Sequence, residues 1–207
     1  MDNKIYLHGI HSLSDNYDSK TTLKILKKVI QSNALLSARM QNKKHHIALF
    51  NGLDYISLCD YEKKDIPNEY SSYENYIRYS LSLIFPKNKI EVLNPEIVDM
   101  VLDYDTIRKY GLSNGKRYTD LYDEVQVKDK ILLDHMSGIT LPISKMKNNF
   151  LNESKTINMV LREIEKINIL LEQYNHLVPL YDIDTFESLD NTENVKQLVR
   201  HYYKNRS

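Results

Sequence analysis

The sequence predicts an α+β fold, in which scattered strands come first and helices follow. Short alternating apolar segments recur between residues 4 and 143, without the regular strand-helix-strand rhythm of a doubly wound parallel sheet. From residue 149 onward, apolar residues recur at helical spacing instead. We therefore expect a sheet domain over residues 1–148 and a helical extension, packed on it, over residues 149–207.

In the first part of the chain, alternation predicts a strand over residues 4–10 and apolar periodicity predicts a helix over residues 20–31. Asp18 or Ser19 is the expected N-cap of that helix. The Asn51-Gly52 turn signal, between residues 45–50 and a strand over residues 54–59, predicts a hairpin.

The middle of the chain predicts further strands and one helical insertion. The expected elements are strands over residues 80–85, 89–93, 122–127 and 138–143, and a helix over residues 95–110 that begins at Pro95. Residues 128–137 are expected to join the last two strands.

Two helical stripes define the C-terminal part. The first comprises Ile157, Val160, Ile164, Ile167, Leu171 and Tyr174, and the second comprises Val195, Leu198, Val199 and Tyr202. Both are expected to bury their apolar faces against the sheet domain.

Composition excludes several classes of protein. Lys plus Arg and Asp plus Glu both number 28, so the net charge indicates neither a nucleic-acid nor a membrane partner. Cys59 is the single cysteine, which rules out an internal disulfide. Residues 1–10 contain charged and polar residues, so no signal peptide is expected, and no apolar stretch in the sequence is long enough to cross a bilayer. We expect a cytoplasmic protein, or one delivered into a target cell without a classical signal.

The common catalytic motifs are absent. The sequence has no glycine-rich phosphate loop, no HExxH, no paired CxxC and no GxSxG. His45-His46 and the Asp103-Tyr-Asp105 pair have no companion at ligand spacing, so no metal site is expected.

Three other segments are more informative because of their order. The first is Tyr6-Leu7-His8-Gly9, followed by a helix and then by residues 33–39. The second is the run Gly52-Leu-Asp-Tyr-Ile-Ser-Leu58. The third is the run from Tyr122 to Ile131, which contains Glu124 and is followed by residues 138–142. Together they resemble the split β-sheet core of the ADP-ribosyltransferase superfamily, with local similarity to its DNA-targeting toxins.

The resemblance implies a site for NAD, which is a substrate of these enzymes. His8 would hydrogen-bond the nicotinamide ribose, and the Gly9 backbone would face the nicotinamide amide. Ser57 or Tyr55, two residues apart on one strand face, would line the nicotinamide pocket. Tyr73, Tyr76 and Tyr79 are alternatives for the pocket tyrosine.

Glu124 is the expected catalytic carboxylate. Cleavage of the nicotinamide-ribose bond develops oxocarbenium-like charge, which a nearby carboxylate stabilises. Arg39 would pair with the pyrophosphate, because a planar guanidinium suits two oxygens. Tyr122 stands where the arginine-modifying toxins carry Glu or Gln, so arginine is a disfavoured acceptor.

The function predicted from the sequence is therefore transfer of ADP-ribose from NAD to a protein or nucleic-acid acceptor. An antitoxin or another regulatory partner would accompany a toxin of this kind. The alternative is a non-catalytic binding module, such as an immunity, adaptor or antidefence protein. The 16 tyrosines favour it, because tyrosine is common at interfaces.

Overall fold

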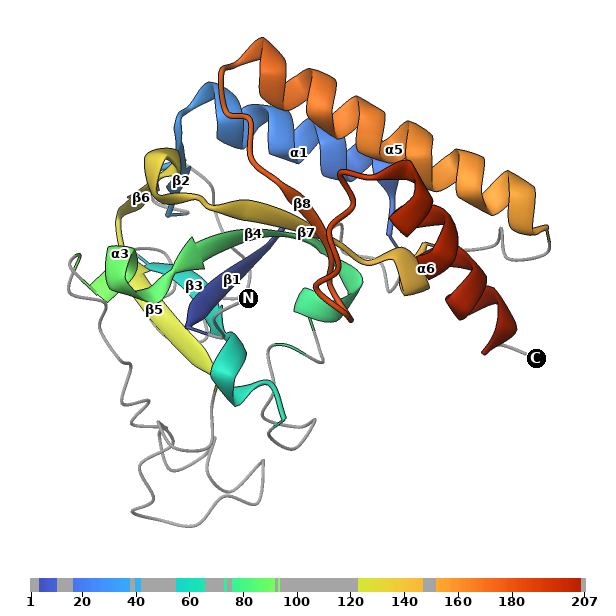
Figure 1. Ribbon diagram of the computed structural model, residues 1–207. Coiled ribbons are helices and arrows are strands. Elements are labelled where there is room, and N and C mark those ends of the chain that lie inside the picture. The colour runs from blue at the N-terminus through green and yellow to red at the C-terminus, as the bar shows by residue number, and fades with distance from the viewer. Residues whose placement is uncertain are drawn as a thin grey trace.

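A computed structural model describes most of the chain (Figure 1). The described residues are 4–10, 17–37, 40–41, 55–65, 73, 76–91, 93, 123–146 and 152–205. The strands are β1 (Ile5–Ile10), β2 (Ala34–Leu36), β3 (Tyr55–Asp60), β4 (Leu81–Pro86), β5 (Glu124–Lys128), β6 (Lys130–Leu132), β7 (Gly138–Leu141) and β8 (Leu180–Asp182). The helices are α1 (Ser19–Gln31), α3 (Lys87–Glu91), α5 (Glu153–Gln173) and α6 (Thr192–Lys204).

Six of these strands form one sheet, in the order β5-β3-β1-β4-β7-β8. All neighbours pair antiparallel except β7 and β8, which are parallel. A separate two-stranded sheet joins β2 to β6. The prediction of an α+β fold without a doubly wound parallel sheet is confirmed.

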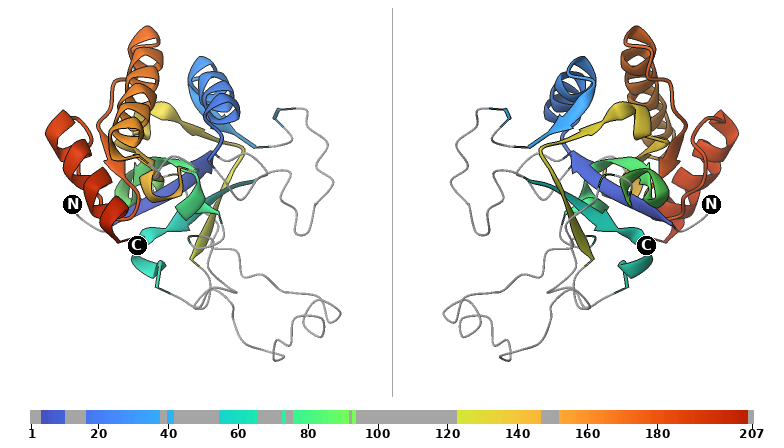
Figure 2. Two further views of the ribbon diagram at one scale, coloured as in Figure 1. Left: turned by 90° about the vertical axis from the view of Figure 1, so that its right-hand side faces the viewer. Right: turned by 90° about the vertical axis from the view of Figure 1, so that its left-hand side faces the viewer.

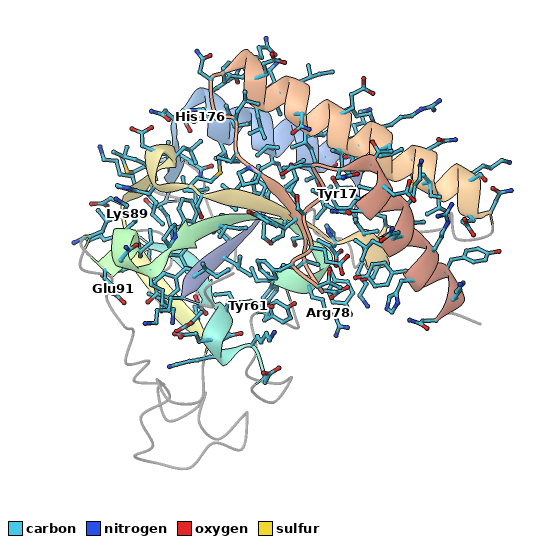
Figure 3. The ribbon with its side chains drawn as sticks, viewed as in Figure 1. Tyr17, Tyr61, Arg78, Lys89, Glu91 and His176 are labelled. Carbon is cyan, nitrogen blue, oxygen red and sulfur yellow. The ribbon has the colours of Figure 1, made fainter. Side chains whose placement is uncertain are left out.

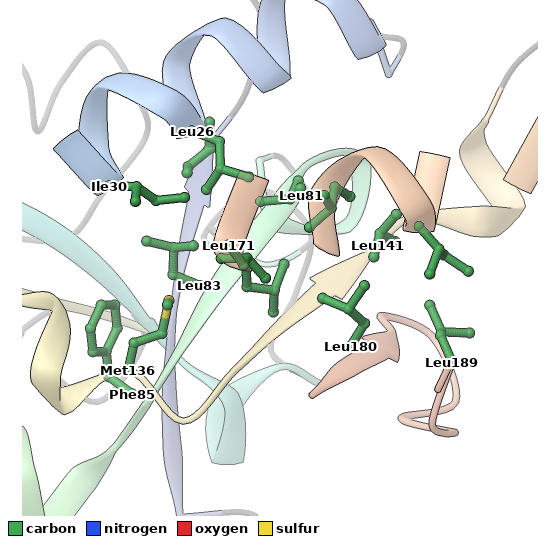
Figure 4. Close-up of a cluster of buried hydrophobic side chains, with 14 of the residues drawn as sticks. Leu26, Ile30, Leu81, Leu83, Phe85, Met136, Leu141, Leu171, Leu180 and Leu189 are labelled. Atoms are coloured by element: carbon green, nitrogen blue, oxygen red, sulfur yellow. The ribbon is translucent and has the colours of Figure 1, made fainter. Parts of the chain in front are cut away.

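Helices cover one face of the six-stranded sheet. α1 and α5 lie side by side over it and α6 lies along α5 (Figures 1 and 2). Strand residues such as Leu83 and Leu141 meet Leu26 of α1 and Leu171 of α5 in one continuous core (Figure 4). Because each of these side chains is fully buried, the hydrophobic effect holds the helical layer to the sheet.

The opposite face carries a smaller cluster. Ile5 and Leu7 of β1 point to it, whereas Tyr6 and Ile10 point to the helical layer. The alternation predicted for residues 4–10 is therefore confirmed. Tyr61, Tyr73, Ile77 and Ile183 complete the smaller cluster together with Cys59 and Ile84.

The helices begin where polar caps allow them to. Asp18 caps α1 by accepting from the backbone N–H groups of Lys20 and Thr21, as predicted for that position. Asn152 and Asn191 cap α5 and α6 in the same way. Both predicted helical stripes are confirmed, because their members are buried or partly buried in the main core.

The expected strand over residues 89–93 is wrong, because α3 occupies this stretch. The chain turns at the end of β4, where the Lys87 N–H donates to the Lys4 carbonyl at 3.0 Å and Lys87 Nζ pairs with Asp60 at 2.6 Å. Ile90 is buried whereas Leu93 is exposed, so one side chain in this stretch reaches the core. A short apolar run does not separate helix from strand.

Three short strands, β2, β6 and β8, were not predicted. β6 lies within residues 128–137, expected only as a connection, and β8 interrupts the C-terminal part expected to be mainly helical. β8 fits beside β7 because Gly138 has no side chain. A Cβ there would lie 3.0 Å from Tyr181 Cε2 and 3.2 Å from the Pro179 carbonyl. The C-terminal part therefore adds a strand to the sheet.

Some predicted elements lie outside the described residues. They are residues 45–50, expected to pair with the strand over residues 54–59 in a hairpin, and the helix over residues 95–110. Within the part of the chain that the structure describes, no helix combines the length and apolar character needed to cross a membrane.

A buried carboxylate ties the start of α1 to α5. Glu163 is only 4% exposed and accepts hydrogen bonds from Tyr17 Oη at 2.8 Å and Ser19 Oγ at 2.7 Å. Lys166 Nζ lies 3.1 Å from the same carboxylate. Burial, and then the adjacent Glu163 charge, raise the pKa of Tyr17, so the phenol remains a donor at neutral pH.

We expect Glu163→Gln to lower the free energy of unfolding by about 1–3 kcal/mol, because one of the two hydroxyl donors loses its acceptor. Thermal or urea unfolding measures this. Glu165→Gln, at an exposed position two residues along α5, is the matched control and should change stability by about 0.5 kcal/mol or less. Equal effects of both variants would contradict the structural role of Glu163.

A second buried carboxylate lies at the end of β8. Asp182 Oδ2 accepts from Tyr202 Oη at 2.6 Å and from Thr185 N and Oγ1 at 3.0 Å each. Asp182 Oδ1 is buried without a hydrogen-bond partner. Burial raises the pKa of Asp182, although the Tyr202 hydrogen bond opposes that change.

Because the folded pKa of Asp182 is raised, its protonated form is favoured in the folded state. The contribution of protonated Asp182 to the free energy of unfolding is complete below the ordinary aspartate pKa. It is lost as the pH rises through the pKa that Asp182 has in the folded protein. Relative to Asp182→Asn, the wild-type protein should therefore lose unfolding free energy as the pH rises above the ordinary aspartate pKa of about 4. Urea unfolding across this range tests it, with Asp134→Asn as the exposed control. A difference independent of pH would contradict the prediction.

Candidate functional site

A pocket of about 260 Å³ opens beside β1, β3 and β5. Three strands supply most of its described lining, and one segment before β4 supplies the rest. The lining residues are His8, Gly9, Ser57, Leu58, Cys59, Tyr76, Ile77 and Glu124. The structure thus brings His8, Ser57 and Glu124 to one pocket, although 116 positions separate the first from the last.

The pocket lies where β1 and β3 stop pairing. Their ladder comprises the pairs Tyr6↔Asp60 and Leu7↔Cys59, whereas β1 pairs with β4 along its whole length. Beyond Leu7, the Ser57 carbonyl receives a side-chain donor, His8 Nδ1, at 2.9 Å. The imidazole therefore bridges the two strands at the point where their backbones separate.

This bond defines the tautomer of His8. A carbonyl oxygen can only accept, so Nδ1 must carry the proton. In a neutral imidazole, Nε2 is then the acceptor nitrogen. His8 is half-buried, so its ring lines the pocket while its backbone stays in the sheet.

Glu124 stands at the first position of β5, opposite Cys59 in the ladder. Gln126 follows on the same strand face, opposite Ser57, and its Nε2 donates to Glu124 Oε1 at 3.2 Å. Gln126 is buried and Glu124 is half-buried. The amide therefore orients a carboxylate that still borders the pocket.

Asp123 anchors the start of β5 from behind the pocket. Its side chain is fully buried, and Oδ2 accepts from the Tyr73 backbone N–H at 2.9 Å and from Cys59 Sγ at 3.4 Å. Its carbonyl accepts from the Asp60 N–H. Asp123 thus fixes the backbone position of Glu124 against β3 and against the segment that carries Tyr73.

Gly9 gives the pocket a wall without a side chain. A Cβ at this position would lie 3.2 Å from Ile77 Cδ1 and 3.4 Å from Ser80 Oγ. Any larger residue would push Ile77, which itself lines the pocket. Glycine at this position therefore lets the segment that carries Ile77 and Ser80 pack closely against β1.

The tyrosines that the sequence offered as alternatives for lining the nicotinamide pocket lie in different places. Tyr76 lines the pocket and is 57% exposed. Tyr73 is buried, with its hydroxyl 3.3 Å from the Ile183 carbonyl, and Tyr79 lies under Lys145 Nζ. Tyr55 pairs with Lys128 at the end of β3 remote from Glu124 and does not line the described pocket.

Arg39, the residue predicted to bind pyrophosphate, lies outside the described residues. So do the His45-His46 and Asp103-Asp105 groups. Among the described residues, no group of three or more His, Cys, Asp or Glu side chains has the arrangement of a metal site.

The sequence reasoning missed Gln126 and Asp123. Gln126 lies two positions from Glu124, so strand alternation alone places both on one face. Asp123 carries no such signal, because its burial depends on Tyr73, 50 positions away.

Comparison with known proteins adds no relative. No protein-family model matches the chain, and neither the curated proteins nor the solved structures contain a match.

We expect neutral His8 to carry its proton on Nδ1, because the Ser57 carbonyl requires a donor there. Long-range nitrogen-proton NMR correlations of the imidazole distinguish the two neutral tautomers. The assignment uses His8→Gln, which removes the signal, and His176→Gln removes a different imidazole as control. An Nε2-protonated His8 would show that this bridge between β1 and β3 does not form.

Proposed function

We propose that this protein is an NAD-dependent ADP-ribosyltransferase and that the pocket between β1, β3 and β5 holds the nicotinamide end of NAD. The observation that carries the proposal is the convergence of His8, Gly9 and Glu124 on one pocket. The resemblance in sequence assigns these same residues to the nicotinamide site. A split between two sheet strands is also what the family's core would require.

The pocket suits part of the dinucleotide. Its volume of about 260 Å³ is just below the range of roughly 300–1,000 Å³ that small-molecule sites usually have. It would hold the nicotinamide ring and the adjoining ribose. The remainder of NAD would extend beyond the described lining, toward the groups that the resemblance assigns to the phosphates, Arg39 among them.

Each lining group has a chemical part in this proposal. Nε2 of neutral His8 would accept from a ribose hydroxyl, and the half-buried backbone at Gly9 would bond the nicotinamide amide. Tyr76 would offer an aromatic wall to the ring, in place of the Tyr55 alternative. Ser57 contributes a hydroxyl on the same face of the sheet as Gln126, its partner on β5.

Glu124 would act on the reacting carbon through its charge. When the bond between nicotinamide nitrogen and ribose C1′ breaks, the electron pair leaves with neutral nicotinamide and positive charge develops on the ribose. The carboxylate stabilises that charge and accepts from the 2′-hydroxyl. An acceptor nucleophile then bonds to C1′ and releases its proton. The Gln126 amide keeps the carboxylate oriented throughout.

The acceptor in this proposal is a protein or a nucleic acid, and an antitoxin or regulatory protein is a further proposed partner. Tyr76 is exposed at the pocket, where an incoming acceptor would meet it. The acceptor can be identified from the mass added after incubation with NAD and a lysate.

Glu124→Gln is expected to reduce nicotinamide release by at least about 100-fold, because it removes the charge that stabilises the transition state. The amide keeps the size of the side chain and one accepting oxygen, so NAD affinity should change far less. Nicotinamide release and NAD binding by calorimetry measure the two effects separately.

Glu172→Gln is the matched control, since this exposed glutamate on α5 lies away from the pocket lining. It should retain wild-type release. Wild-type activity in Glu124→Gln would remove Glu124 from the mechanism. If the wild-type protein neither binds NAD nor gains thermal stability from it, the enzyme proposal fails and the binding-module alternative gains support.

A further inference from the structure

A second and larger pocket, of about 480 Å³, lies on the other side of the segment that precedes β4. Ile77 lines the first pocket and its neighbour Arg78 lines the second, so the two pockets flank one stretch of backbone. Figure 3 labels Arg78 below β8 and α6. The second pocket is lined by Lys64, Asp65, Tyr73, Arg78, Ser144, Lys145, Asp184, Tyr202 and Asn205.

Among the described residues, three cationic side chains line this pocket. Lys64 Nζ bonds to Tyr61 Oη at 2.9 Å and lies over the same ring, and Lys145 Nζ lies 5.1 Å from the Tyr79 ring centroid. These partners are neutral, so they do not cancel the ammonium charges. Within the described part of the chain, neither lysine forms an ion pair.

Arg78 differs because it is ion-paired. Its Nε lies 3.4 Å from Asp184 Oδ1, and the arginine side chain is 37% exposed. Asp184 also accepts from Ser144 Oγ, so this carboxylate is held on the pocket wall from two sides. This ion pair places the Arg78 guanidinium at the pocket wall, next to the carboxylate.

The lining therefore combines two kinds of recognition. The two lysines without a described ion pair, together with Arg78, whose charge Asp184 offsets, suit an anionic group with several oxygens, such as a phosphate monoester. Asp184 and Asp65 are acceptors that suit the hydroxyls of a sugar. A phosphate alone would leave most of the 480 Å³ empty.

We propose that this second pocket binds a phosphorylated sugar, with the phosphate against Lys64, Arg78 and Lys145 and the sugar hydroxyls toward Asp184 and Asp65. The site is distinct from the one proposed for nicotinamide and does not depend on that function. A free sugar phosphate and the 5′-phosphorylated end of a nucleic acid offer the same chemistry.

The test is a calorimetric titration of the full chain with ribose 5-phosphate, with unphosphorylated ribose as the ligand control. Saturable binding of the phosphate ester alone is expected. Lys145→Gln should weaken the Kd about fivefold, as expected for loss of one charge-assisted contact. Lys130→Gln, on the exposed face of β6 at the opposite side of the molecule (Figure 1), should leave it unchanged.

Lys64→Gln tests the phosphate contact at the second lysine of the pocket. Neither Lys64 nor Lys145 forms an ion pair within the described residues, so both substitutions should leave folding intact. No saturable binding of ribose 5-phosphate, or equal losses in Lys145→Gln and Lys130→Gln, would overturn the proposal. The site is also overturned if unphosphorylated ribose binds equally well.

Two further probes identify the source of the ligand. Tighter binding of a 5′-phosphorylated dinucleotide than of ribose 5-phosphate supports a nucleic-acid end, and the reverse order supports a free sugar phosphate. NAD has no terminal monoester and should bind this pocket more weakly than either. If NAD is the tightest ligand and Lys145→Gln removes its binding, the pocket belongs to the dinucleotide site and the proposal of a separate one fails.

Discussion

The short ladder between β1 and β3 is the constraint on which the rest of the candidate site depends. Two residue pairs hold these strands together, and beyond Leu7 the Ser57 carbonyl would be left without a backbone donor. His8 supplies the missing donor through its side chain. This one bond therefore links β1 to β3 at the point where their backbone ladder ends.

The separation of β1 and β3 beyond Leu7 does not interrupt the packing of the helices on the sheet. Leu83, Leu141 and Leu180 continue the core along β4, β7 and β8, where the sheet meets α5 and α6. The pocket therefore lies toward the β5 side of a sheet whose other half is firmly covered. The strands beside the pocket also belong to the main core, through Leu58 of β3 and Val125 of β5.

Much of the fold followed from periodicity in the sequence. The alternation through Tyr6 and Ile10, the Asp18 cap and the stripe through Val160 each report a local rule that the structure obeys. α3, β2, β6 and β8 were missed because each is at most five residues long, so a period hardly repeats within it. Their positions are set by distant contacts, such as the approach of Tyr181 to Gly138.

The candidate site was less accessible to such rules. No period links His8 to Glu124, and it was the resemblance to a family that placed them together. Tyr73, Tyr76 and Tyr79 are three positions apart and equivalent in sequence, so only the fold distinguishes the pocket residue from the buried one. Gln126 could have been found, because strand alternation already relates it to Glu124.

The parallel pairing of β8 with β7 has a consequence for synthesis on the ribosome. The strands around the candidate pocket, β1, β3 and β5, all precede β7 in the chain, whereas β8 follows only after the whole of α5. Until residues 180–182 emerge, the nascent chain carries β7 as an open sheet edge, which is a template for intermolecular strand pairing. The α5 segment, with its own apolar stripe, emerges during that interval and can shelter the nascent sheet from neighbouring chains.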